Sequence, residues 1–403
     1  MNLKRILLAA VLATAPSAVI ADDFGVTETA IRIAVQDSLS GAYSQYGVPS
    51  LNGVRYVFDK VNAEGGINGR KIEVVAEDDG CSPKQSVGVA TKLASERSVL
   101  AVMGLTCSAA AIAVRDTVAP TTPMPFISFS SGGYTSSSPD LGGLKENFFF
   151  ITPSVHTQGG ALVNFVMNTL KPQRVAFIGQ TDVYGKEGRQ GVEAMLAEYG
   201  QKIIADDTME PRGTDATAQV LKLKAANPDV VIAFLYQVPA QILLRQANEL
   251  GLKATIVTSA SVTDSSIYKS LPPAALENYY GSMMAKDVLD SARMKPIMDD
   301  LRARYPDVTF NPLVVSGIGA AELMVEALRS LGKDVTPEKL AKAIDQSKDV
   351  KTSALSYPVT FTPENHMGGR GLGIYEIKDN AEVLAMPGYW PGTEKASEPV
   401  VAN

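Results

Sequence analysis

Short apolar runs alternate with amphipathic stretches along this chain, and the series occurs twice. A short apolar run followed by a stretch with a 3.6-residue apolar period is typical of a strand and then a helix. Repeated strand–helix units favour a parallel sheet that is covered by helices on both faces. The sequence therefore predicts an α/β fold with two doubly wound, Rossmann-like lobes. Ligands of such sheets bind beyond the carboxyl ends of the strands, so a cleft between the lobes is expected.

The predicted elements follow from this pattern. In the first series the expected strands are 31–35, 72–77, 100–103 and 125–129, and the expected helices are 49–64, 83–96 and 108–118. Residues 148–152 are expected to cross to the second series, with helices 157–169, 185–199, 215–226 and 239–250 and strands 174–178, 203–208, 230–235 and 255–258. Further helices are expected at 291–305, 317–331 and 337–343, and strands at 355–361 and 373–377, with a glycine turn at 368–371 and a loose tail after 387.

Residues 1–21 have the pattern of a signal peptide. Lys4 and Arg5 precede a short apolar core, and small residues lie before Asp22. The apolar core is too short for a membrane anchor, and the absence of a nearby cysteine argues against a lipid anchor. We expect a soluble periplasmic protein without stable membrane insertion.

Removal of Lys4 and Arg5 leaves 35 basic against 43 acidic residues, a net charge near −8. Nucleic-acid binding favours a basic surface, so this balance argues against a nucleic-acid partner. The length suits two domains of ordinary size.

The chain has two cysteines, Cys81 and Cys107. In an exported protein a single pair is expected to form a disulfide, worth about 3–4 kcal/mol for a loop of this size. Ser108 follows directly and opens an alanine-rich run that indicates a helix start. A helix N-terminus beside a cross-linked loop can bind an anion. Ordinary N-capping by Ser108 is the alternative.

Ser130, Ser131 and Gly132 follow the next predicted strand, at the same sheet edge as Ser108. Glycine lets backbone N–H groups approach a ligand, so this loop and Ser108 are expected to hold one carboxylate together. An ordinary flexible loop is the alternative.

Five tyrosines are expected in loops at this edge: Tyr43, Tyr46, Tyr134, Tyr184 and Tyr236. Tyrosine combines flat apolar area with one polar group, which suits a small aromatic or amphipathic ligand. Any one of them can equally serve packing.

Few residues suggest catalysis. The two histidines, His156 and His366, lie far apart in sequence, and no catalytic motif of common hydrolases or phosphate-binding enzymes occurs. Gly317-Ile318-Gly319 lacks the third glycine of a dinucleotide loop. Asp78-Asp79 could be an acid–base pair, although capping of a turn is the stronger interpretation, as it is for Asp182 at a helix start. The sequence predicts a protein that is not an enzyme and needs no cofactor or metal.

Several short motifs, in order, resemble one known family. They are Ser40-Gly41, Gly47, Asn52-Gly53, residues 62–69, residues 78–85, Cys107-Ser108, residues 171–174, Tyr184-Gly185 and residues 244–247. The chain is similar to the leucine/isoleucine/valine-binding protein family, the type I periplasmic solute-binding proteins of ABC importers.

The resemblance implies two lobes that are joined by three crossings and close on a solute. Lobe 1 would comprise 22–151 and 284–365, and lobe 2 would comprise 152–283 and 366–403. It also implies the Cys81–Cys107 disulfide. The solute carboxylate would lie at Ser108 and at the loop with Ser130 and Gly132. Aromatic contacts are implied at Tyr46, Tyr184 and Tyr236.

One position departs from the amino-acid binders of that family. They place a glutamate after the strand at 255–258, whereas this chain has Ala260 at the aligned position. A buried ammonium without a counter-charge costs several kcal/mol. The departure favours a carboxylate without an amine, aromatic in view of the tyrosines.

We therefore expect a monomeric receptor that delivers a small carboxylate solute to the permease subunits of an ABC importer. Two alternatives remain: an amino-acid or amide binder of the same family, and a periplasmic ligand sensor on this fold.

Overall fold

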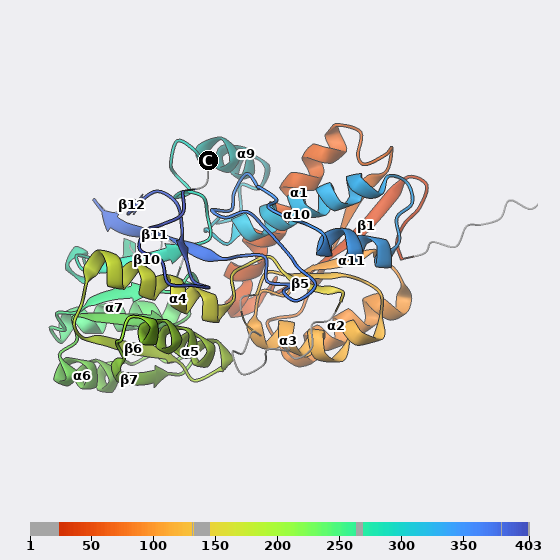
Figure 1. The fold of residues 1–403 in the computed structure, drawn as a ribbon. Helices are drawn as coiled ribbons and strands as arrows, with labels where there is room; N and C mark the ends of the chain where they lie inside the picture. Colours follow the sequence, from red (N-terminus) through yellow and green to blue (C-terminus); the bar gives the residue numbers. More distant parts are fainter. Residues whose placement is uncertain (1–23, 131, 133–145, 263–268, 380, 402–403) are drawn as a thin grey trace, which may run out of the picture.

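The computed structural model describes residues 24–130, 132, 146–262, 269–379 and 381–401. These residues form two sheets, each accompanied by helices, and the chain passes from one to the other more than once (Figure 1). The predicted signal peptide at 1–21, Ser131 and Tyr134 lie outside the described residues. Within the described part of the chain, no helix combines the length and apolarity that a membrane crossing requires.

The first sheet has five parallel strands in the order β2-β1-β3-β4-β5. Its strands are β1 (Ala30–Asp37), β2 (Lys71–Asp78), β3 (Ala101–Gly104), β4 (Phe126–Ser128) and β5 (Phe148–Phe150). The helices beside it are α1 (Ser44–Ala63), α2 (Pro83–Glu96), α3 (Ser108–Thr117), α9 (Lys295–Arg304), α10 (Val314–Leu331) and α11 (Pro337–Asp345).

Helices α1 and α10 pack with their backbones nearly touching. A Cβ at Gly53 would lie 2.5 Å from the Val314 carbonyl oxygen, and one at Gly317 would lie 2.0 Å from the Ser50 carbonyl oxygen. Glycine is therefore the residue that allows this close crossing, which brings the C-terminal part of the chain back onto the first sheet.

The second sheet has the order β12-β11-β10-β9-β8-β6-β7, with β13 paired to β11. Its strands are β6 (Val175–Gln180), β7 (Ile203–Met209), β8 (Val230–Phe234), β9 (Thr255–Thr258), β10 (Tyr279–Met283), β11 (Gly371–Lys378), β12 (Ala381–Leu384) and β13 (Trp390–Pro391). Strands β6 to β10 are parallel, and β11, β12 and β13 join antiparallel. Its helices are α4 (Val155–Phe165), which continues as a π-helix (Val166–Leu170), α5 (Val183–Glu198), α6 (Thr217–Ala226) and α7 (Gln237–Glu249).

The chain crosses between the sheets after β5, after β10 and between α11 and β11. The first and third crossings lie side by side, because the Phe150 N–H donates to the His366 carbonyl and the Gly368 N–H donates to the Phe150 carbonyl, each at 2.8 Å. Two lobes and a doubly wound α/β fold are thus confirmed.

Two predictions for the C-terminal region are wrong. The expected strand at 355–361 is replaced by isolated bridges, such as Val350 with Val359, because Pro358 has no N–H to donate to a ladder. The tail after 387 is ordered: Trp390 is buried in β13, and the Asn164 amide donates to the Pro391 and Glu394 carbonyls at 2.7 and 2.8 Å. These contacts hold the tail on α4.

Among the helix starts that differ from expectation, two move predicted site residues. Helix α1 begins at Ser44 rather than at Pro49, so Tyr46 lies in a helix and not in a loop. Helix α5 begins at Val183, which places Tyr184 inside it. The Gly185 N–H donates to the Asp182 side chain at 3.2 Å. Asp182 is therefore the N-cap of α5, which confirms the capping role that the sequence favours.

Candidate functional site

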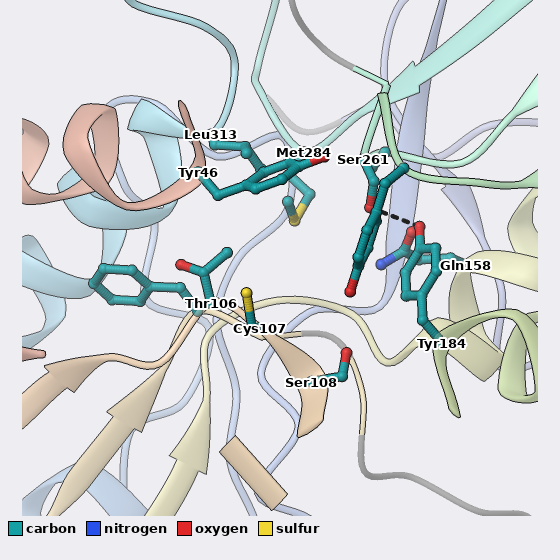
Figure 2. Close-up of a pocket in the computed structure, with 12 residues that line it drawn as sticks. Tyr46, Thr106, Cys107, Ser108, Gln158, Tyr184, Ser261, Met284 and Leu313 are labelled. Atoms are coloured by element: carbon teal, nitrogen blue, oxygen red, sulfur yellow. Dashed lines mark hydrogen bonds between the residues drawn. The ribbon is translucent and has the colours of Figure 1, made fainter. Parts of the chain in front are cut away.

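A pocket lies where the carboxyl ends of the two sheets face each other (Figure 2). Its twelve lining residues are Tyr46, Thr106, Cys107, Ser108, Phe129, Gln158, Tyr184, Tyr236, Ala260, Ser261, Met284 and Leu313. We call Thr106, Cys107 and Ser108 the β3–α3 wall, because they connect β3 to α3. We call Gln158, Tyr184, Ala260 and Ser261 the opposite wall.

The β3–α3 wall presents the start of α3. Cys107 is the N-cap and Ser108 is the first helical residue, so the alternative of N-capping by Ser108 is wrong. Ser108 is 4% exposed. The first backbone N–H groups of a helix have no partner within the helix, and they carry a partial positive charge. This end of the pocket can therefore bind a carboxylate without a basic side chain.

The loop after β4 meets Ser108 directly. The Ser130 hydroxyl donates to the Ser108 hydroxyl at 3.3 Å, and the Gly132 N–H donates to Ser130 Oγ at 3.0 Å. A Cβ at Gly132 would lie 2.2 Å from both Cβ and Oγ of Ser108, so this position accepts only glycine without a shift. The structure thus brings Ser108, Ser130 and Gly132 together, although Ser130 and Gly132 lie behind the lining.

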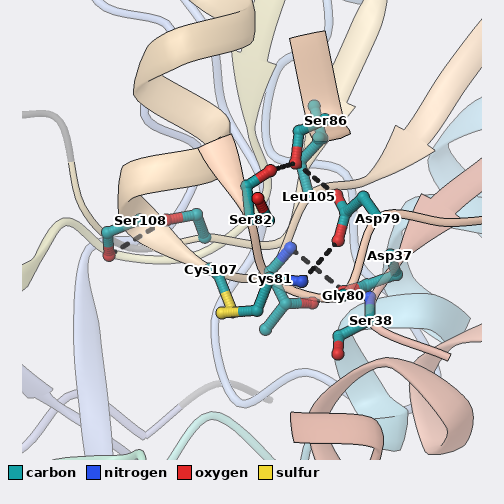
Figure 3. The surroundings of a disulfide bond; sticks show 12 residues. Asp37, Ser38, Asp79, Gly80, Cys81, Ser82, Ser86, Leu105, Cys107 and Ser108 are labelled. Atoms are coloured by element: carbon teal, nitrogen blue, oxygen red, sulfur yellow. Dashed lines mark hydrogen bonds between the residues drawn. A yellow bond between two sulfur atoms is a disulfide. The ribbon is translucent and has the colours of Figure 1, made fainter. Parts of the chain in front are cut away.

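Behind this wall, a disulfide and two carboxylates fix the loop (Figure 3). Cys81 and Cys107 are bonded, with their Cα atoms 5.5 Å apart, which confirms the predicted pair. The Asp37 carboxylate accepts from the Thr106 hydroxyl at 2.6 Å and from its N–H at 3.3 Å. Burial, followed by the charge of Asp79, raises the pKa of Asp37 to about 7, although bonds from Thr106 and Ser38 act in the opposite direction.

Asp78 and Asp79 act as turn and loop caps. Asp78 accepts from the Leu39 and Gly80 N–H groups, at 2.9 and 3.0 Å. Asp79 accepts from the Cys81 N–H and the Ser86 hydroxyl, both at 2.9 Å, and burial raises its pKa. Neither lines the pocket, so the capping interpretation of this pair fits the structure and the acid–base interpretation does not.

Four of the five predicted tyrosines form one aromatic cluster across the pocket. The ring centroids of Tyr46 and Tyr236 are 5.7 Å apart, those of Tyr184 and Tyr236 are 5.1 Å apart, and Tyr43 lies 6.3 Å from both Tyr46 and Tyr236. Tyr46 belongs to α1 and Tyr236 precedes α7, so the cluster joins the two lobes. The Gln237 N–H also donates to the Tyr46 hydroxyl at 3.3 Å.

The opposite wall is built on a chain of hydroxyl groups. Ser261 donates to the Tyr184 hydroxyl, which donates to Ser259, each at 2.7 Å. Figure 2 shows Ser261 and Tyr184 joined in this way, with Gln158 beside them. Ala260 lies between the two serines, is 2% exposed and offers only a methyl group.

The pocket lining carries no formal charge among the described residues. Burial raises the pKa of Tyr184 to about 12 and raises those of Tyr46 and Tyr236 as well, so the phenols stay neutral at physiological pH. No cluster of three or more metal-ligating side chains occurs in the described part of the chain. Among the described residues, the lining can hold an anion through backbone N–H groups and offers no carboxylate for an ammonium.

The pocket is partly open to solvent and has a volume of about 40 Å³. A cavity that binds benzene has about 150 Å³. An aromatic solute therefore requires the two walls to separate from their present positions.

Of the predicted site residues, Tyr46, Ser108, Tyr184, Tyr236 and Ala260 line the pocket. Ser131 lies outside the described residues. Sequence reasoning did not single out Gln158, Met284 or Leu313. Gln158 lies inside a predicted helix, and its sequence neighbourhood gives no sign that it faces a cleft.

The fold and this pocket define a two-lobed solute-binding protein. A family model described as "Periplasmic binding protein" matches residues 30–382, and the chain belongs to this family. The leucine-specific-binding protein of Salmonella typhimurium is 26% identical over 350 residues, which cover 86% of this chain and 90% of that protein. Such relatives are binding proteins and not enzymes, in agreement with the sequence expectation.

Solved structures share the fold. The substrate-binding protein of a branched-chain amino acid transporter from Streptococcus pneumoniae, in complex with isoleucine, has a TM-score of 0.76 and 22% identity, covering 90% of this chain and all of that one. A solute-binding protein of an ABC transporter from Rhodopseudomonas palustris, in complex with benzoate, has a TM-score of 0.75 and 18% identity, covering 90% and 97%.

Proposed function

We propose that this protein is the periplasmic receptor of an ABC importer and that its solute is a small carboxylate without an amine, most simply an aromatic acid. The observation that carries the proposal is the uncharged pocket lining around the N-terminus of α3. Backbone N–H groups and hydroxyls stabilise the solute carboxylate, each charge-assisted bond contributing about 1.5–3 kcal/mol. The rings of Tyr46, Tyr184 and Tyr236 then cover its apolar part.

The described residues of the opposite wall include no carboxylate, which argues against an amino acid. Ala260 leaves an ammonium without a counter-charge, which costs several kcal/mol. The benzoate complex of the structural neighbour supports an aromatic acid, while the names of the relatives support a branched-chain amino acid. Amino-acid or amide binding is therefore the second candidate, and a periplasmic ligand sensor is a third.

The mechanism is hinge closure. We assign lobe 1 to 22–151 and 284–365 and lobe 2 to 152–283 and 366–403, with 1–21 as a signal peptide that directs a monomer to the periplasm. A solute that contacts both walls stabilises the closed state by its extra contacts there. The permease subunits would recognise that closed form.

A thermal-shift screen tests the solute class. The wild-type protein is tested against leucine, valine, amides, benzoate and phenylpropanoid acids. We expect the aromatic acids to raise the Tm most, because ligand binding stabilises the folded state by about 2.7 kcal/mol at one hundred times Kd.

Calorimetry on Ser108→Ala tests the carboxylate site. The variant should lower the binding free energy of the best acid by about 1–2 kcal/mol, which is the loss of one hydrogen bond to a charge. A larger shift with leucine, or unchanged affinity in Ser108→Ala, would contradict this assignment.

A further inference from the structure

Gln158 is a polar residue of the pocket lining whose hydrogen bonding is incomplete. It lies in α4, it is 2% exposed, and its Oε1 has no partner among the described residues. A buried acceptor without a donor costs free energy, so such an atom in a binding pocket points to a missing donor.

The orientation of the Gln158 amide follows from its other contact. Its Nε2 donates to the Pro153 carbonyl oxygen at 3.2 Å. The opposite orientation would place two acceptor oxygens against each other. The amide oxygen is therefore the atom left without a partner.

The Ser261 and Tyr184 hydroxyls do not supply that donor. The Ser261 proton is used toward Tyr184 and the Tyr184 proton toward Ser259. Ser261 Oγ keeps acceptor capacity, as every hydroxyl oxygen has two lone pairs. Around Gln158 the opposite wall therefore offers acceptors, whereas the β3–α3 wall offers N–H donors.

We propose that Gln158 is a specificity-determining residue that selects acids carrying a hydroxyl group in addition to the carboxylate. This inference rests on the proposed function, because the carboxylate at α3 orients the solute. The hydroxyl group of the solute donates to Gln158 Oε1. No charged side chain among the described lining residues is needed for this hydrogen bond. An ammonium group of the solute could also donate to these acceptors, but its buried charge would have no counter-charge. A neutral hydroxyl donor avoids that desolvation cost and therefore fits this wall better.

Calorimetry with matched acids tests the proposal. Each pair differs by one hydroxyl: propanoate with lactate, phenylacetate with mandelate, and benzoate with its three hydroxy isomers. In the wild-type protein we expect at least one hydroxy acid to bind about tenfold more tightly than its parent. In Gln158→Met, which keeps the length but lacks the amide, the ratio should fall to about one. Gln158→Leu is a second variant in case Met disturbs folding.

Gln36→Met is the matched control. Gln36 is another buried glutamine whose Oε1 has no partner among the described residues, but it lies in β1 and not in the lining. Its Nε2 donates to Asp79 and to the Ser86 carbonyl, so its variant can change the affinity for every acid through the disulfide loop, whereas the ratio within a pair does not depend on it. Its variant should keep the tenfold ratio. Equal binding of every pair in the wild-type protein, or a preference that survives in both Gln158 variants, would overturn the inference while leaving carboxylate binding intact. If the protein bound leucine but none of the acids that lack an amine, the proposed function would be overturned instead.

Discussion

The two walls of the pocket are held in place by different forces. The β3–α3 wall is cross-linked by Cys81–Cys107 and tied through Thr106 to the buried Asp37. The opposite wall depends on hydroxyl hydrogen bonds, chiefly those of Tyr184 with Ser259 and Ser261.

This difference indicates that the two walls have different roles in solute binding. Preorganised N–H groups stabilise a charge best when their positions are fixed, and a cross-link with buried carboxylates fixes them. Hydroxyl groups reorient at little cost, so the opposite wall is suited to adjusting to the remainder of the solute. The comparison can be tested by weakening each wall separately.

The largest effect is expected from the cross-link. Replacing both Cys81 and Cys107 by alanine should lower the free energy of unfolding by about 3–4 kcal/mol, because the unfolded chain regains loop entropy. Urea unfolding measures it. Dithiothreitol should destabilise the wild type similarly and leave the double variant unchanged. Equal stability of the two proteins would mean that the cross-link does not fix this wall.

The next effect concerns pH and Asp37. Its pKa rises from 3.8 to about 7 on folding, so between these values the folded state holds a proton that the unfolded state has released. Stability from this group is therefore greatest at low pH and falls as pH rises to about 7. Relative to the wild type, Asp37→Asn should gain roughly 2–3 kcal/mol in unfolding free energy between pH 5 and pH 8.

Asp78→Asn is the control for that series. The pKa of Asp78 is lowered, because bonds from Ser40, Leu39 and Gly80 outweigh its partial burial. Both of its states are ionised above pH 5, so its difference from the wild type should stay flat. A flat difference for Asp37→Asn as well would show that Asp37 carries its charge in the folded protein throughout this range.

The smallest effect is expected on the opposite wall. Tyr184→Phe removes the hydroxyl that joins Ser259 to Ser261 and should lower the free energy of unfolding by about 1 kcal/mol. The control is Tyr43→Phe in the same aromatic cluster, since the Tyr43 hydroxyl has no hydrogen bond within the described part of the chain. If Tyr184→Phe lowered the free energy of unfolding as much as the double cysteine variant does, the two walls would not differ in how strongly they are held.

Local patterns were sufficient for much of the fold. Helix α2 (Pro83–Glu96) and strand β9 (Thr255–Thr258) have the predicted bounds, because proline in a first helical turn and a short β-branched run are strong local signals. The start of α1 was missed because Pro49 resembles a first-turn proline, although here it lies inside the helix. Strand β10 was missed because Tyr279–Met283 has little apolar pattern of its own and gains its place by pairing with β9 and β11.

The sequence by itself determined the two alternating series, the cysteine pair and the helix start at Ser108, since each depends on neighbours along the chain. Only the tertiary structure decided that Gln158, Met284 and Leu313 face the same pocket and that the tail packs on α4. These contacts join segments far apart in the chain, and their formation depends on how the lobes meet rather than on any local preference.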